Sequence, residues 1–228
     1  PEALSGENQS ITHYEPYKVT PVEGSHAGKY SIILAIGESL NPHHVSALGY
    51  DRDTTPELKA LMQQYQGTGR LIVSNAVSTR VAIPMLVNNL REPDNYDAYK
   101  SKSTNIFTNA KKQGYQTAFI SAQGLEGLSN WIGIHDIDLW EDTQIRPAPD
   151  VGADVVLTPS VEQAKLDWNK PFLMVLNSRA PHIPYERNIP QGFAKFSTPR
   201  LSDDVAQKKN EYDDAVRLYD KELASAIR

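Results

Sequence analysis

Apolar residues recur along this chain in short runs that alternate with longer amphipathic stretches. Four runs are rich in β-branched and aliphatic side chains, as buried strands are, and lie at residues 30–39, 70–77, 115–123 and 171–179. Five stretches have helical spacing or helix-start signals and lie at residues 54–65, 83–90, 103–114, 155–168 and 210–227. This alternation predicts an α/β domain in which a mostly parallel sheet is sandwiched between helices.

The first 28 residues lack such periodicity and are polar. We interpret residues 1–28 as a linker or lead-in and residues 29–228 as one domain, because 228 residues suit a single buried core. No run of about 18 apolar residues occurs, so no segment of this sequence is expected to span a bilayer.

Composition narrows the function classes only slightly. Apolar residues make up 39% and charged residues 22%, as in ordinary globular proteins. The formal net charge of -5 argues against nucleic acid as a partner. The chain has no cysteine, which excludes disulfides and thiolate metal sites.

Polar side chains follow each predicted strand. Glu38 follows the first strand, Thr79 and Arg80 follow the second, Gln123 ends the third and His182 follows the fourth. Because ligands bind at the carboxyl ends of parallel strands, we expect these side chains to meet at one edge of the sheet.

A carboxylate and an imidazole are ligands that zinc takes readily, and a hydroxyl bound to such an ion loses its proton more easily. A hydroxyl near a helix N-terminus is also favoured as an alkoxide or beside a phosphate. The set therefore suits phosphoryl transfer through a covalent intermediate. Each residue taken singly also has a structural explanation. Glu38 could be a turn residue and Thr79 a helix N-cap, while Arg80 could be a solvated side chain and His182 a surface histidine.

Four stretches resemble the phosphoethanolamine transferases of the alkaline phosphatase and sulfatase superfamily. They are IGESLNPHHVSALGYDRDTTPEL (36–58), STRVAIPM (78–85), RAPHIPYERNIPQGFAKF (179–196) and NEYDDAVRLYDKEL (210–223). In the second, Thr79 precedes Pro84 by five residues, as the family's nucleophile does. The resemblance runs from about residue 30 to the end of the sequence.

The resemblance implies a zinc-dependent enzyme of the bacterial inner membrane, anchored by a region outside this sequence, with its catalytic domain in the periplasm. It would move phosphoethanolamine from a phospholipid such as phosphatidylethanolamine to lipid A, a lipopolysaccharide core sugar or another envelope glycan. Glu38 and Thr79 would bind zinc, and Thr79 would be the nucleophile. His182 would contact the phosphoryl group or a second zinc. Independently of the resemblance, their placement makes Arg80 a candidate for binding phosphate and Gln123 a candidate for contacting the donor or the acceptor.

The sequence departs from the family in two places. The family's remaining metal ligands lie in an Asp-His-Gly stretch, which is absent here, so we expect a domain that is incomplete at its C-terminus. For such a fragment we predict weak zinc binding and little transferase activity. Lipid A-modifying members also carry cysteines near the positions of Asn75 and Met85, which favours another acceptor.

Other functions fit the same residues. Phosphoglycerol transfer, or hydrolysis by a metal-dependent phosphodiesterase or sulfatase, would use the same nucleophile. The sulfatase pattern Cys/Ser-x-Pro-x-Arg is not matched at Thr79. A non-catalytic lipid-binding relative is the remaining alternative, and the presence of both Glu38 and Thr79 argues against it. The sequence leaves the acceptor unspecified.

Overall fold

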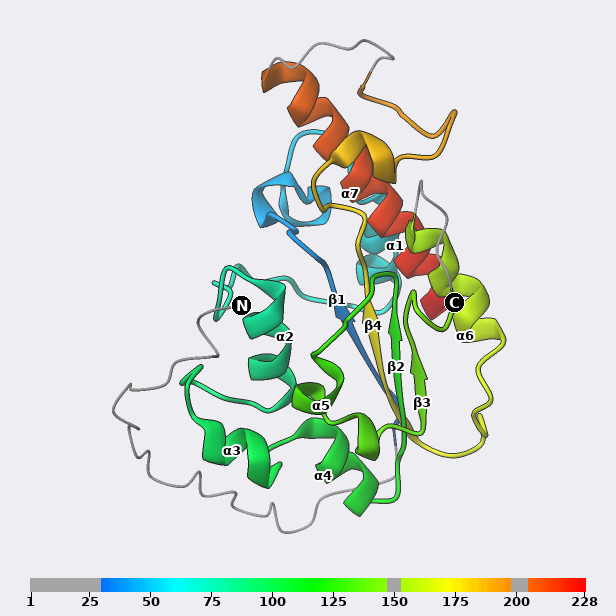
Figure 1. Ribbon diagram of the computed structural model, residues 1–228. Coiled ribbons are helices and arrows are strands. Elements are labelled where there is room, and N and C mark those ends of the chain that lie inside the picture. The colour runs from blue at the N-terminus through cyan, green and yellow to red at the C-terminus, as the bar shows by residue number, and fades with distance from the viewer. Residues whose placement is uncertain (1–29, 147–152, 198–204) are drawn as a thin grey trace.

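The computed structural model contains a sheet of four parallel strands (Figure 1). In spatial order the strands are β1 (Ile32–Ile36), β4 (Phe172–Asn177), β2 (Gln116–Ser121) and β3 (Leu139–Glu141). The structure describes residues 30–146, 153–197 and 205–228, so the predicted lead-in at residues 1–28 lies outside the described residues. The expectation of an α/β fold with a parallel sheet is confirmed.

Helices cover both faces of this sheet (Figure 1). One face packs against α6 and α7, and the other packs against α2, α4 and α5. The α-helices are α1 (Pro56–Gln64), α2 (Thr79–Val87), α3 (Tyr96–Ser101), α4 (Ile106–Lys112), α5 (Ser129–Ile132), α6 (Leu157–Glu162) and α7 (Val205–Ile227). Short 3-10 helices lie at Pro42–His44, Ser46–Leu48, Ile134–Asp136, Ala153–Val156 and Tyr185–Asn188.

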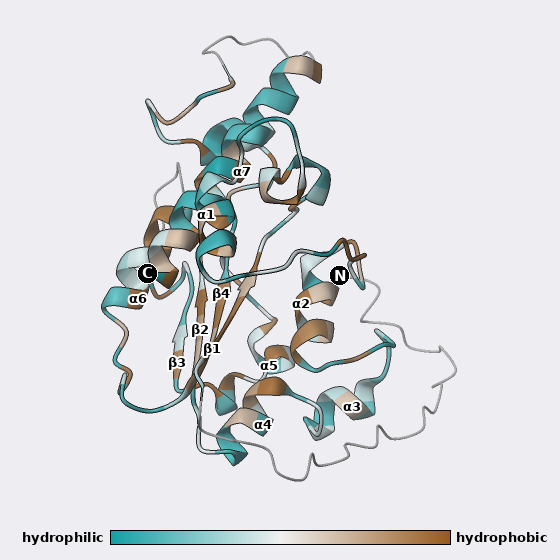
Figure 2. Cartoon of the chain, turned by 180° about the vertical axis from the view of Figure 1, so that it is seen from behind, coloured by the Kyte–Doolittle hydropathy of each residue, from teal (hydrophilic) through white to brown (hydrophobic). Residues whose placement is uncertain are grey.

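The central strands are apolar on both sides because both of their faces are covered. In β2, Ile120 packs towards α6 and α7, whereas its neighbour Phe119 packs towards α2, α4 and α5. Met174 and Val175 of β4 divide between the two faces in the same way. This alternation makes the strands hydrophobic along much of their length, as Figure 2 shows for β1 and β4.

The prediction of a strand at residues 70–77 is wrong. Leu71, Ile72 and Val73 are 61%, 84% and 95% exposed, and no strand of the described chain pairs with this segment. The preference of β-branched residues for strands reflects packing against neighbouring strands, and among the described residues no strand lies beside this segment. The segment nevertheless delivers the chain to the start of α2, as expected.

Several helix boundaries differ from the prediction. The helix expected at residues 83–90 begins at Thr79, which places Pro84 inside α2 instead of in its first turn. The helix expected at residues 155–168 ends earlier, at Glu162, and the last helix begins earlier, at Val205. β3, α3 and α5 were not predicted, because each has six residues or fewer and too little periodicity to detect.

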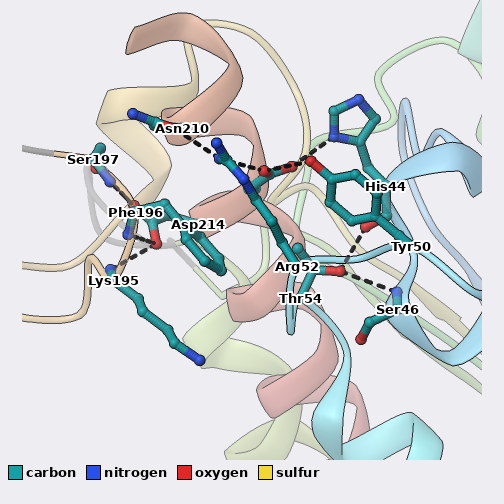
Figure 3. A network of polar contacts seen from close by, with 11 residues as sticks. His44, Ser46, Tyr50, Arg52, Thr54, Lys195, Phe196, Ser197, Asn210 and Asp214 are labelled. Carbon is teal, nitrogen blue, oxygen red and sulfur yellow. Dashed lines mark hydrogen bonds and ion pairs between the residues drawn. The ribbon is translucent and has the colours of Figure 1, made fainter. Parts of the chain in front are cut away.

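Helix α7 is anchored to the loop after β1 through Asp213, whose side chain is fully buried. The Asp213 carboxylate lies 2.6 Å from Nδ1 of His44 and accepts hydrogen bonds from the Tyr50 hydroxyl and the Arg52 guanidinium, each at 2.9 Å. Figure 3 shows His44, Tyr50 and Arg52 converging from the loop, with Asn210 of α7 bonded to Arg52. Burial, and then the bond to Asp213, raises the pKa of Tyr50 to about 12.

Two further aspartates of α7 bind backbone N–H groups of other segments. Asp214 accepts from three consecutive N–H groups, at residues 195–197 (Figure 3). Asp220 accepts from the N–H groups of Glu57 and Leu58, at 2.8 and 2.7 Å, and so caps the first turn of α1. The aspartates of α7 therefore connect this helix to the loop after β1, to the start of α1 and to residues 195–197.

Candidate active site

A cavity of about 520 Å³ lies at the carboxyl end of the sheet. It is lined by the loops after β1, β2 and β4 and by the start of α2. The lining residues are Glu38, Ser39, Val77, Ser78, Thr79, Arg80, Gln123, Gly124, Leu125, Glu126, Leu128 and His182. All five residues that the sequence predicts for the site, at positions 38, 79, 80, 123 and 182, thus line one cavity.

The Thr79 hydroxyl donates a hydrogen bond of 2.7 Å to Oε2 of Glu38. Thr79 is the first residue of α2, and Ser78 occupies the cap position with extended backbone. The hydroxyl therefore lies at the positive end of the helix dipole, where negative charge on oxygen is stabilised. Both residues are half-buried, so the hydroxyl is shielded but reachable from the cavity.

The chain turns sharply immediately after Glu38. Ser39 has a φ of 52°, in the left-handed region that residues other than glycine seldom adopt. Its hydroxyl donates a 3.1 Å hydrogen bond to Oε1 of Glu38. Both oxygens of Glu38 are therefore hydrogen-bonded, and the residue after it has an unusual backbone conformation. Such backbone conformations are common at functional sites.

Gln123 is buried, and its side-chain amide donates a 3.2 Å hydrogen bond to Oε2 of Glu38. Its backbone is fixed by Ser121, whose hydroxyl accepts from the Gln123 N–H and donates to its carbonyl. Asn177, at the end of β4, in turn donates to that hydroxyl. A continuous set of hydrogen bonds therefore runs from β4 through β2 to Glu38 and Thr79.

Arg80 and His182 supply the basic groups of the cavity. Arg80 is exposed and follows Thr79 in the first turn of α2. His182 is half-buried, and its Nδ1 lies 2.5 Å from the carbonyl oxygen of Ile183. That contact places a proton on Nδ1, because a carbonyl oxygen only accepts hydrogen bonds. Together the two side chains make the cavity suitable for an anionic group.

Asp154 supports the loop that leads to His182, and sequence reasoning missed it. This fully buried carboxylate accepts hydrogen bonds from the Ser178 hydroxyl and from the N–H groups of Arg179 and Ala180, at 2.6, 2.6 and 3.0 Å. Burial raises the pKa of Asp154, although the three hydrogen bonds favour its charged form. In the sequence it resembles an ordinary helix cap, because its partners lie 24 to 26 residues away.

The described residues fit a zinc ion only in part. The Thr79 hydroxyl and the Glu38 carboxylate lie side by side and offer two oxygen ligands. No group of three or more histidine, cysteine, aspartate or glutamate side chains among the described residues is arranged to hold a metal. Zinc sites in proteins have at least three protein ligands, so the described residues alone do not complete a zinc site.

None of the helices in the described part of the chain combines the length and apolar character required to cross a bilayer.

Comparison with known proteins shows sequence similarity to one family along most of the chain. A family model described as Sulfatase matches residues 31–228. The phosphoethanolamine transferase EptC of Escherichia coli (strain K12) is 27% identical over 218 residues, which are 87% of this chain and 36% of EptC. The phosphoethanolamine transferase CptA of Salmonella typhimurium (strain LT2) is 29% identical over 205 residues, 81% of this chain and 34% of CptA. The chain thus spans about a third of the length of these curated relatives.

Solved structures share the fold. The C-terminal periplasmic domain of EptC from Escherichia coli, in complex with Zn, superimposes with a TM-score of 0.64 at 24% identity, covering 90% of this chain and 60% of that one. The soluble domain of lipooligosaccharide phosphoethanolamine transferase A from Neisseria meningitidis gives a TM-score of 0.63 at 18% identity, covering 87% and 61%. These similarities confirm the predicted architecture.

Proposed function

The chain belongs to the sulfatase family, and from this premise we propose that it transfers phosphoethanolamine from a phospholipid to lipid A, a lipopolysaccharide core sugar or another envelope glycan through a phosphothreonine at Thr79. One observation carries the proposal: the Thr79 hydroxyl donates to Glu38 at 2.7 Å, inside a cavity at the carboxyl end of the sheet. We choose phosphoethanolamine as the transferred group because the relatives EptC and CptA are named phosphoethanolamine transferases.

The geometry suits a two-step displacement. Oγ1 of Thr79 attacks the donor phosphorus while its proton passes to Oε2 of Glu38, which already accepts it. The bond from phosphorus to the lipid oxygen breaks, and diacylglycerol leaves with the proton. In the second step an acceptor hydroxyl attacks the same phosphorus, the bond to Oγ1 breaks, and Thr79 recovers a proton from the acceptor.

The neighbouring residues have supporting roles in this proposal. Arg80 supplies positive charge to the phosphoryl oxygens, whose charge grows as the group is transferred, and His182 lines the same cavity. Gln123 holds Glu38 in position by its hydrogen bond to Oε2. A zinc ion bound by Glu38 and Thr79 would lower the pKa of the threonine hydroxyl. The solved EptC domain in complex with Zn supports this choice of metal.

We place the catalytic domain in the bacterial periplasm, attached to the inner membrane by a region outside this sequence. The support comes from relatives: the solved domains of EptC are described as periplasmic. In this setting the donor is a membrane phospholipid, and phosphatidylethanolamine carries the group that the proposed reaction transfers.

Substituting the nucleophile tests the proposal. For the full-length protein with phosphatidylethanolamine vesicles and a lipopolysaccharide acceptor, Thr79→Ala should lower the transfer rate by at least about 1,000-fold, because the variant lacks the hydroxyl that forms the intermediate. Thr79→Ser keeps a hydroxyl and should retain measurable transfer. Ser74→Ala, in the exposed segment before α2, is the control and should leave the rate unchanged. Full transfer by Thr79→Ala would remove Thr79 from its role.

A further inference from the structure

A second carboxylate lines the cavity, and the reaction proposed for Thr79 does not use it. Glu126 is exposed at the cavity wall, and no hydrogen bond or ion pair joins it to another residue in the described part of the chain. By contrast, both oxygens of Glu38 are occupied by Thr79, Gln123 and Ser39. Glu126 is therefore the carboxylate of the cavity that is available to a ligand.

The backbone presents Glu126 rigidly. The N–H of Leu128 donates to the carbonyl of Leu125 at 3.0 Å, which closes a tight turn with Glu126 and Gly127 at its centre. Gly127 has a φ of 74°, as the second central residue of a type II turn requires. Leu125 and Leu128 are 3% and 6% exposed and anchor both ends of the turn in the core. The backbone of Glu126 is thus ordered beside the cavity and has little freedom to lose on binding.

The cavity carries charges of both signs. An anion beside Thr79 is favoured by Arg80, His182 and the N-terminus of α2. Glu126 adds a negative charge, which would repel a ligand that carries only an anionic group. The described residues contain no three-ligand metal group that includes Glu126. A ligand that bears a phosphate and a separate cationic group satisfies both halves of the cavity.

We infer that Glu126 binds the ammonium group of the ligand and so selects phosphoethanolamine over head groups that lack a cation, such as phosphoglycerol. The inference rests on the proposed function for the identity of the phosphate-bearing group. Charge-assisted hydrogen bonds to a carboxylate are strong, and a glycerol head group would leave this carboxylate without a cation. Glu126 is thus a specificity-determining residue, and the chemistry of Thr79 does not depend on it.

Binding of the isolated head groups tests the inference without requiring transfer. The probes are O-phosphoethanolamine and glycerol 3-phosphate, titrated into the 228-residue protein and followed by NMR chemical shifts. Glu126→Gln should weaken binding of O-phosphoethanolamine about 5-fold, as expected for loss of an exposed charge pair, and leave binding of glycerol 3-phosphate unchanged or slightly tighter. Glu126→Asp should recover part of the preference. Glu162→Gln, on the exposed side of α6, is the matched control and should change neither affinity.

The outcomes separate this inference from the proposed function. Equal weakening of both probes, no change in either, or no preference for O-phosphoethanolamine in the unaltered protein would overturn the role of Glu126. Selective binding that depends on Glu126 supports the inference even if the full-length protein transfers nothing from phosphatidylethanolamine, a result that would overturn the proposed function alone.

Discussion

At the scale of single residues, the site combines side chains that were identifiable in the sequence with others that were not. Glu38, Thr79 and His182 follow apolar runs and match family motifs, so sequence reasoning found them. Asp154 and Glu126 gave no such signal. The role of Asp154 depends on the Ser178 hydroxyl and the backbone N–H groups of residues 179 and 180, and that of Glu126 on a turn whose conformation no spacing rule specifies.

Asp154 should be needed for the stability of the loop that carries His182. Asp154→Ala would leave the N–H groups of Arg179 and Ala180 and the Ser178 hydroxyl without their acceptor. We expect the free energy of unfolding, measured by urea denaturation, to fall by about 2–4 kcal/mol. Asp51→Ala, at an exposed position, is the control and should cost less than about 0.5 kcal/mol. A loss in Asp154→Ala as small as in the control would contradict the assigned contacts.

At the scale of secondary-structure elements, prediction succeeded where a segment has both propensity and tertiary partners. β2 and β4 were found because both faces of each are buried, which produces a continuous apolar run. The segment at residues 70–77 is also apolar but has no pairing strand in the described chain, so it remains irregular and exposed. The early start of α2 escaped prediction because Pro84 suggested a helix beginning next to it.

The junction between α7 and α1 should make stability depend on pH. Burial raises the pKa of Asp220 from an ordinary 3.8 to about 6, against the effect of the two N–H groups of α1 that it accepts. Between these two values the folded protein keeps a proton that the unfolded chain has released. The contribution of Asp220 to stability is therefore largest below pH 3.8 and is lost as the pH rises to about 6.

Comparison with Asp220→Asn isolates this contribution, because the amide does not titrate and all other groups are shared. The free energy of unfolding of each protein is measured by urea denaturation at several pH values. Relative to Asp220→Asn, the unaltered protein should lose stability as the pH rises from about 4 to about 6, and the difference should stay constant above that pH. A difference that is constant across this range would show that the pKa of Asp220 is not raised by folding.

At the scale of the whole molecule, the parallel sheet explains why distant segments form one site. The carboxyl ends of β1, β2 and β4 lie together, so residues 38, 79, 123 and 182 line one cavity although 144 positions separate the first from the last (182 − 38). Helix α7 then fixes the loop after β1 through Asp213. The hydrogen bonds among Glu38, Thr79 and Gln123 hold the hydroxyl and its acceptor carboxylate in place before any substrate binds.

The central claim is that Thr79 carries the transferred group. The direct measurement is mass spectrometry of the full-length protein after incubation with phosphatidylethanolamine and no acceptor, followed by peptide mapping. We predict a gain of one phosphoethanolamine group on the peptide that contains Thr79, its disappearance when acceptor is added, and its absence in Thr79→Ala. An adduct on another residue, or transfer to acceptor with no adduct at any time, would contradict this role of Thr79.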